Sequence, residues 1–161
     1  MRAPVAAAEW ESDIAYRYGA RLYAQGFFWE AHEVWEAVWK ACPPNGIERR
    51  LLRGLIALAN AALKVRMGRA NAALRLVAEA DELLGEAGAS ARTETVMGVA
   101  VAPLRAAAQA LAAAIRAGGG GTGGGIGGRT GGVMGGGAGG IGEVGRILRP
   151  LDPVANGWTP T

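Results

Sequence analysis

Apolar side chains recur every three or four residues in five successive segments of this chain, and each segment ends near a glycine or a proline. In the first segment, about residues 9–25, Trp10, Ile14, Tyr18 and Leu22 share one face. This spacing matches the 3.6-residue turn of an α-helix and conflicts with the two-residue alternation of a half-buried strand. The sequence therefore predicts an all-α fold, a bundle of about five helices.

The breaks between these segments position the other four helices. Consecutive prolines cannot continue a helix, so the short Pro-Pro-Asn-Gly connection at 43–46 makes the second and third helices a central antiparallel hairpin. The third segment is apolar around most of its circumference, which predicts the most buried helix. A loop is expected over 85–98. The four helices are expected at about 28–41, 47–67, 70–86 and 100–116.

The composition changes abruptly after the fifth segment, because 18 of the 27 glycines lie between Gly118 and Gly145. Glycine disfavours a helix, and a glycine-rich segment behaves as a flexible chain. We therefore expect a helical domain over residues 1–117 and a disordered, glycine-rich, low-complexity tail over 118–161. In the less favoured alternative, the end of the tail docks on the domain through Ile147, Leu148, Leu151 and Trp158.

Composition also excludes several classes of protein. Half of the 161 residues are hydrophobic, which is enough for one core, but no apolar run reaches the about 18 residues of a membrane span. No secretory signal is recognised at the N-terminus. Cys42 is the only cysteine, which excludes an intrachain disulfide and agrees with a reducing compartment. We expect a cytoplasmic protein without a membrane partner.

A basic run follows the central turn, with no acidic residue inside it, and accounts for much of the net charge of +3. A solvated and partly internally paired helix face explains such a run better than phosphate binding. No nucleic-acid partner is therefore expected. The run consists of Arg49, Arg50, Arg53, Lys64, Arg66, Arg69 and Arg75.

The second predicted helix carries the candidate site. His32 and Glu36 are four residues apart and are neighbours on the helix surface, and Glu33 lies at the edge of the same stripe. The third helix offers partners across the hairpin, because Arg53, Asn60 and Lys64 share a narrow stripe. The predicted network joins Glu36 to Arg53 and His32 to Asn60, edged by Trp35 and Trp39.

Three meanings of this cluster stay open. A satisfied polar network that sets the packing of two helices is favoured over metal binding by His32, Glu36 and Glu33, and metal binding is favoured over acid-base catalysis. Cys42 is about 15 Å further along the helix and cannot complete a zinc site. The order His-Glu-x-x-Glu lacks the second histidine of a metalloprotease, and no nucleophile is identified, so no catalytic residue is assigned.

The run over residues 22–39 resembles the prokaryotic family called domain of unknown function 309, whose hallmark His-x-x-x-Glu-x-x-Trp matches His32, Glu36 and Trp39. Residues 52–59 resemble the second block of that family, and the similarity extends over about residues 10–116. The resemblance implies an uncharacterised all-helical domain whose motif binds metal. The chain departs from the family pattern after the third helix, where it has Gly68-Arg69 and family members often have Gly-Asn. A role of that asparagine in the family therefore cannot be assigned to this chain.

The sequence thus favours a non-enzymatic domain whose cluster binds a divalent metal or a small ligand, or only orders the core. A weaker likeness to one tetratricopeptide unit supports an alternative, a protein-interaction or oligomerising module that uses its aromatic surface, and a homo-oligomer stays open. That pattern does not recur about 34 residues later, as a solenoid requires. A metal-dependent hydrolase is the second alternative.

Overall fold

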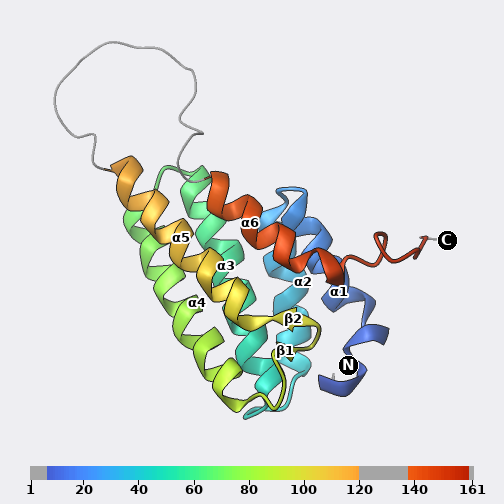
Figure 1. The fold of residues 1–161 in the computed structure, drawn as a ribbon. Helices are drawn as coiled ribbons and strands as arrows, with labels where there is room; N and C mark the ends of the chain where they lie inside the picture. Colours follow the sequence, from blue (N-terminus) through green and yellow to red (C-terminus); the bar gives the residue numbers. More distant parts are fainter. Residues whose placement is uncertain (1–6, 120–137, 160–161) are drawn as a thin grey trace, which may run out of the picture.

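A computed structural model of the chain describes residues 7–119 and 138–159, and it confirms the all-α fold (Figure 1). A two-stranded antiparallel hairpin is the sole β-structure in these ranges. No helix within them is both long enough and apolar enough for a membrane crossing. The elements are η1 Ala7–Ser12, α1 Ile14–Ala24, α2 Phe28–Ala41, α3 Ile47–Arg66, α4 Ala70–Ser90, β1 Thr95–Val96, β2 Val99–Ala100, α5 Val101–Gly119, α6 Ala138–Leu148 and η2 Arg149–Leu151.

Local sequence signals explain where the first helices begin and end. The carboxylate of Asp13 caps α1 by accepting a hydrogen bond from the Tyr16 backbone N–H at 2.8 Å. Gly26 and Gly68 adopt positive φ angles of 82° and 71°, which glycine tolerates better than any other residue. These two positions let α1 reverse into α2 and α3 reverse into α4.

The core is centred on α3, which contacts α2 on one side and α4 on the other (Figure 1). Small and branched apolar side chains of α3 are fully buried, as expected for the central helix: Leu51, Leu52, Leu55, Leu58, Ala59, Ala61 and Ala62. On the α1–α2 side the largest buried side chain is Trp35, whose Nε1 donates a hydrogen bond to the Tyr16 carbonyl at 2.9 Å. This bond ties α2 to α1.

The prediction of a loop over residues 85–98 is wrong for residues 85–90, because α4 continues to Ser90. Gly85 and Gly88 face α5: a Cβ on them would lie 3.2 Å from Arg105 and 3.1 Å from Val101. Close packing of two helices therefore overrides the weak helix propensity of glycine. The chain then turns through β1 and β2, and the Met97 carbonyl at this turn accepts a hydrogen bond from the Tyr16 hydroxyl at 2.9 Å.

An ion pair joins α4 to α5 beside these glycines. Arg105 Nε and a second guanidinium nitrogen donate to the two carboxylate oxygens of Asp81 at 2.9 and 3.2 Å, and Gln109 donates at 3.2 Å. The hydrogen bonds from Arg105 hold the pKa of Asp81 below its ordinary value. A carboxylate with a lowered folded-state pKa stabilises the fold above its unfolded pKa, and that stabilisation is lost as the pH falls.

We expect Asp81→Asn to lower the free energy of unfolding by about 0.5–1 kcal/mol at pH 7, since both partners are partly exposed. The difference from the wild type should shrink as the pH is lowered through the acidic range, because protonation of Asp81 removes the same charge. Urea unfolding at pH 7 and at about pH 3 measures both values. Glu82→Gln, an exposed neighbour on α4, is the control. A difference independent of pH would contradict this assignment.

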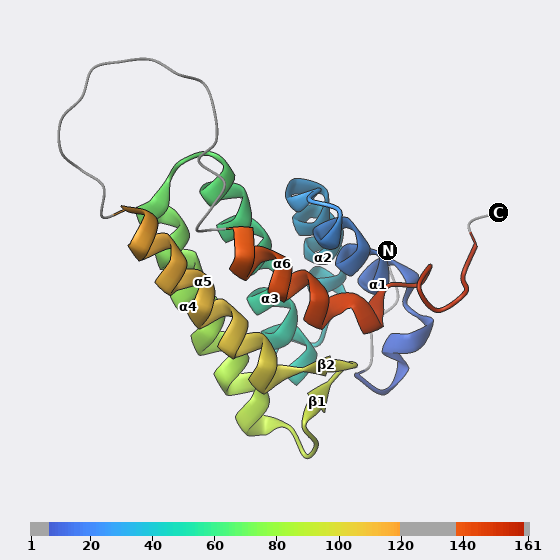
Figure 2. The ribbon, with the colours of Figure 1, turned by 45° about the horizontal axis from the view of Figure 1, so that its top comes forward.

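The prediction of a disordered tail is wrong from residue 138 onward, because residues 138–148 form the helix α6, which packs against α5 and α1 (Figure 2). Leu148 and Leu151 are fully buried, so the docking alternative describes this segment better. Gly140 permits the contact, since a Cβ there would lie 2.6 Å from the Leu111 Cα. The predicted disorder of residues 120–137 concerns a segment outside the described residues. The domain boundary after residue 117 stays a prediction.

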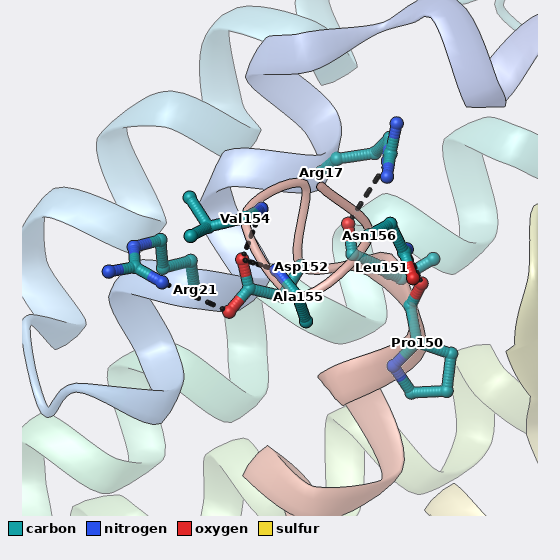
Figure 3. A network of polar contacts seen from close by, with 8 residues as sticks. All are labelled: Arg17, Arg21, Pro150, Leu151, Asp152, Val154, Ala155 and Asn156. Carbon is teal, nitrogen blue, oxygen red and sulfur yellow. Dashed lines mark hydrogen bonds and ion pairs between the residues drawn. The ribbon is translucent and has the colours of Figure 1, made fainter. Parts of the chain in front are cut away.

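Polar contacts with α1 hold the segment that follows α6 (Figure 3). Arg17 Nε donates to the Leu151 carbonyl at 3.1 Å, and Arg21 pairs with Asp152 Oδ2 at 3.3 Å. The other Asp152 oxygen accepts a hydrogen bond from the Val154 backbone N–H at 2.9 Å. Two arginines one turn apart on α1 therefore attach this segment to the first helix.

Candidate functional site

The candidate site lies on one flank of α2, next to the face that the helix turns toward the core. That core face consists of Phe28, Ala31, Trp35 and Val38. The side chain of His32 is 14% exposed, that of Glu36 33% and that of Glu33 53%. The cluster thus runs from a mostly buried imidazole to a carboxylate in contact with solvent.

The three side chains converge. His32 Nδ1 lies 3.2 Å from a Glu33 carboxylate oxygen, and His32 Nε2 lies 3.7 Å from Glu36 Oε2. The first contact lacks hydrogen-bond geometry, so Nδ1 is buried without a hydrogen-bond partner in the described part of the chain. One ligand atom from each of the three residues falls within 4.8 Å of the other two.

Lys40 holds one side of Glu36. Its Nζ lies 2.7 Å from Glu36 Oε1, one turn further along α2. The hydrogen bond and charge of Lys40 lower the pKa of the Glu36 carboxyl, which keeps the group ionised at neutral pH. The second oxygen of Glu36 faces His32 and is not used by Lys40. Lys40 was not among the predicted site residues, although its spacing of four from Glu36 is the helical signal for such a pair.

Aromatic side chains border the cluster. The ring of Trp29 lies 5.3 Å from the His32 imidazole at a tilt of 32°, and 55% of Trp29 is exposed. Trp39 is partly buried, with the Arg49 guanidinium 4.0 Å from its ring centre. Trp35 belongs to the core instead, because it is fully buried and bonded to α1. Of the two tryptophans predicted to flank the cluster, Trp35 therefore lies in the core and Trp39 contacts Arg49.

The structure does not bring together the residues of the network that was predicted across the hairpin. Arg53 pairs with Glu79 on α4 at 3.3 Å, whereas Glu36 pairs with Lys40 on its own helix. Asn60 and Lys64 are partly buried on α3, but neither makes a hydrogen bond or ion pair within the described ranges. The reason is rotational: α3 packs between two helices, and the flank that carries Arg53 lies beside α4.

Several members of the basic run have partners inside the protein. Arg49 donates to the Trp39 and Cys42 carbonyls at 3.1 and 3.0 Å, which closes the α2–α3 turn. Arg50 pairs with Glu86 at 3.6 Å. The internal pairing that we expected for this face is therefore present at Arg49, Arg50 and Arg53.

The fold and the site define a small all-helical protein with a histidine and two carboxylates gathered on its second α-helix. Residues 16–76 match the family model described as Domain of unknown function (DUF309), which confirms the resemblance over this segment. The match extends from α1 into α4 and includes His32, Glu36 and Trp39. Comparison with curated proteins and with solved structures produced no match.

Proposed function

We propose that His32, Glu33 and Glu36 bind a divalent metal ion. The observation that carries the proposal is the convergence of one imidazole nitrogen and two carboxylate oxygens within 4.8 Å of one another. A nitrogen and two oxygens form a ligand set suited to zinc, manganese or ferrous iron. The buried Nδ1 of His32, without a hydrogen-bond partner in the described part of the chain, fits a site that gains order when a ligand is added.

Binding is the function that this geometry supports best. Three protein ligands would leave a coordination position open to water or to a small ligand, and a divalent metal supplies Lewis acidity at such a position. His32 is held against Trp29, and Glu36 is held ionised by Lys40. A metal-dependent hydrolase would require a substrate-binding group beside this cluster, so hydrolysis ranks below binding in the proposal.

Titration calorimetry with Zn²⁺ and Co²⁺ on tag-free protein tests the proposal. We expect one ion per chain. Binding should be weaker by more than about 10- to 100-fold in His32→Ala and in Glu36→Gln, since each removes a ligand and the loss of a group that only orients a ligand already costs about that factor. Glu30→Gln is the matched control, because it removes the same charge from α2 outside the cluster. Thermal melts of all variants establish that each is folded.

Two outcomes would contradict metal binding by His32, Glu33 and Glu36. The first is equal affinity in the wild type, His32→Ala and Glu30→Gln, which would assign the ion to other carboxylates. The second is no binding at all, with His32→Ala and Glu36→Gln melting several degrees lower. That second result would make the cluster a structural network that orients α2.

A second candidate function is association with another protein, including a further copy of this chain. The observation that favours it is the exposure of three large apolar side chains, Phe27, Trp29 and Met67, each about half exposed. Trp29 also covers His32, so a partner bound there would adjoin the cluster. We also propose that the protein is cytoplasmic, because a chain with a single cysteine forms no intrachain disulfide and so does not require an oxidising compartment.

A further inference from the structure

A cleft separate from the His32 cluster lies between α6 and the turn that joins α1 to α2. Its volume is about 370 Å³, within the range of about 300–1000 Å³ common for small-molecule sites. Tyr23, Phe28 and Ile141 provide apolar walls, and Gly26 and Gly142 leave it open. Because α6 lies outside residues 16–76, the family match does not describe this cleft.

Positive charge borders the cleft. Arg149 lines it, is exposed and makes no ion pair within the ranges that the structure describes. Arg66 stacks on the Phe28 ring, with its guanidinium 4.5 Å from the ring centre, and donates to the Gly26 carbonyl at 2.7 Å. Neither guanidinium is neutralised by a carboxylate of the described chain. Arg149 therefore lines an apolar pocket as a cation unpaired within the described chain, and Arg66 contacts two of the residues that line it, Gly26 and Phe28.

The other charged groups of the cleft are already paired. Arg146 is held by Glu143, one turn earlier on α6, with a hydrogen bond of 3.0 Å. Asp152 is held by Arg21 at 3.3 Å. The charges within each pair cancel locally, so the net positive charge that lines the cleft is that of Arg149.

One wall residue of the cleft, Tyr23, carries a buried hydroxyl. Tyr23 lines the cleft and is almost fully buried, and its hydroxyl has no hydrogen-bond partner among the residues described. Burial raises the pKa of Tyr23, so the hydroxyl stays protonated. Buried polar groups in folded proteins are nearly always satisfied by protein, water or ligand. Tyr23 is thus a buried donor that lacks an acceptor among residues 7–119 and 138–159.

We propose that this cleft binds a small organic anion. The apolar body of the ligand packs against Tyr23, Phe28 and Ile141, and its anionic group pairs with Arg149 at the rim. Guanidinium groups bind carboxylate, phosphate and sulfonate through the same charge-assisted hydrogen bonds, so the class is set by one anionic group on an apolar body.

The test uses two fluorescent probes of nearly identical shape. One is 8-anilinonaphthalene-1-sulfonate, and the other is N-phenyl-1-naphthylamine, which lacks the sulfonate. We expect saturable one-site binding of the sulfonate by the folded protein, about tenfold tighter than that of the neutral probe, because a charge-assisted hydrogen bond is worth about that factor. Arg149→Gln should remove most of this preference and leave the affinity for the neutral probe unchanged.

Two glycines of α6 provide a matched pair of blocking variants. A Cβ at Gly142 or at Gly139 would meet nothing within 4 Å, but only Gly142 lines the cleft. Leucine favours a helix over glycine by about 1 kcal/mol, so neither substitution should weaken the fold. We expect Gly142→Leu to weaken binding of both probes at least about tenfold, whereas Gly139→Leu should bind them as the wild type does.

Three results would overturn the proposal. Unchanged probe binding in Gly142→Leu would place the probes elsewhere on the protein. Equal affinity of the wild type for the charged and neutral probes would show that Arg149 does not bind the anionic group. Non-saturable binding that rises with thermal denaturation would indicate exposed core and no formed site. Melting curves of each variant, recorded without probe, separate a blocked cleft from a misfolded one.

Discussion

Replacement of Gly19 by alanine is expected to lower the free energy of unfolding by about 2–4 kcal/mol, although the same change in an exposed helix stabilises by about 1 kcal/mol. The reason is the indole of Trp35, which crosses α1 at this position. A Cβ on Gly19 would lie 2.2 Å from Trp35 Nε1, which no relaxed structure tolerates. Trp35 is fully buried within the hydrophobic core, so the indole has packed side chains around it.

The cost of Gly19→Ala has two parts. The indole must move against a packed core, and its hydrogen bond to the Tyr16 carbonyl, 2.9 Å long, is broken or distorted. Overpacking costs about 1–3 kcal/mol, and an unsatisfied buried group costs a similar amount. Urea unfolding followed by circular dichroism measures the change.

A double-mutant cycle assigns the effect of Gly19→Ala to the indole. If Trp35 causes the loss, Gly19→Ala should cost much less in a Trp35→Leu background, and the two substitutions should be strongly non-additive. Gly139→Ala on α6 is the control, because its Cβ meets nothing within 4 Å and should be neutral or stabilising. Additive effects of the two changes would show that Trp35 is not the obstacle.

The second large effect is expected at Gly140, where α6 crosses α5. A Cβ on Gly140 would lie 2.6 Å from the Leu111 Cα and 2.9 Å from its backbone nitrogen. A backbone cannot rotate away as a side chain does, so α6 must shift as a unit. We expect Gly140→Ala to cost about 1–3 kcal/mol and to loosen α6 from the bundle.

Hydrogen exchange measures the loosening of α6 directly. Amides of α6 should lose protection in Gly140→Ala, together with those near Leu148 and Leu151, whose side chains are buried only because α6 is docked. The amides of α3 should change little. Gly139→Ala, one residue earlier, again serves as the control. Wild-type protection of α6 in Gly140→Ala would mean that the contact with Leu111 is not tight.

Helix positions and the composition of the site were predictable, because both depend on residues close in the chain. The 3–4 periodicity and the breaks at 43–46 and 68 predicted α2 and α3 to within one residue. His32, Glu33 and Glu36 lie within one turn of α2, so helical geometry alone brings them together. The pair of Lys40 with Glu36 follows from the same rule.

Contacts between helices were not predictable in this way. The side to which Arg53 points depends on the rotation of α3 between two neighbours, and counting residues from a turn does not determine that rotation. The sequence therefore determined, by itself, the all-α class, the central helices and the His-Glu cluster, since these rest on local backbone geometry. Only the tertiary structure decided that glycine-bearing α6 forms a docked helix, because burial against α5 and α1 outweighs the entropy lost by ordering its glycines.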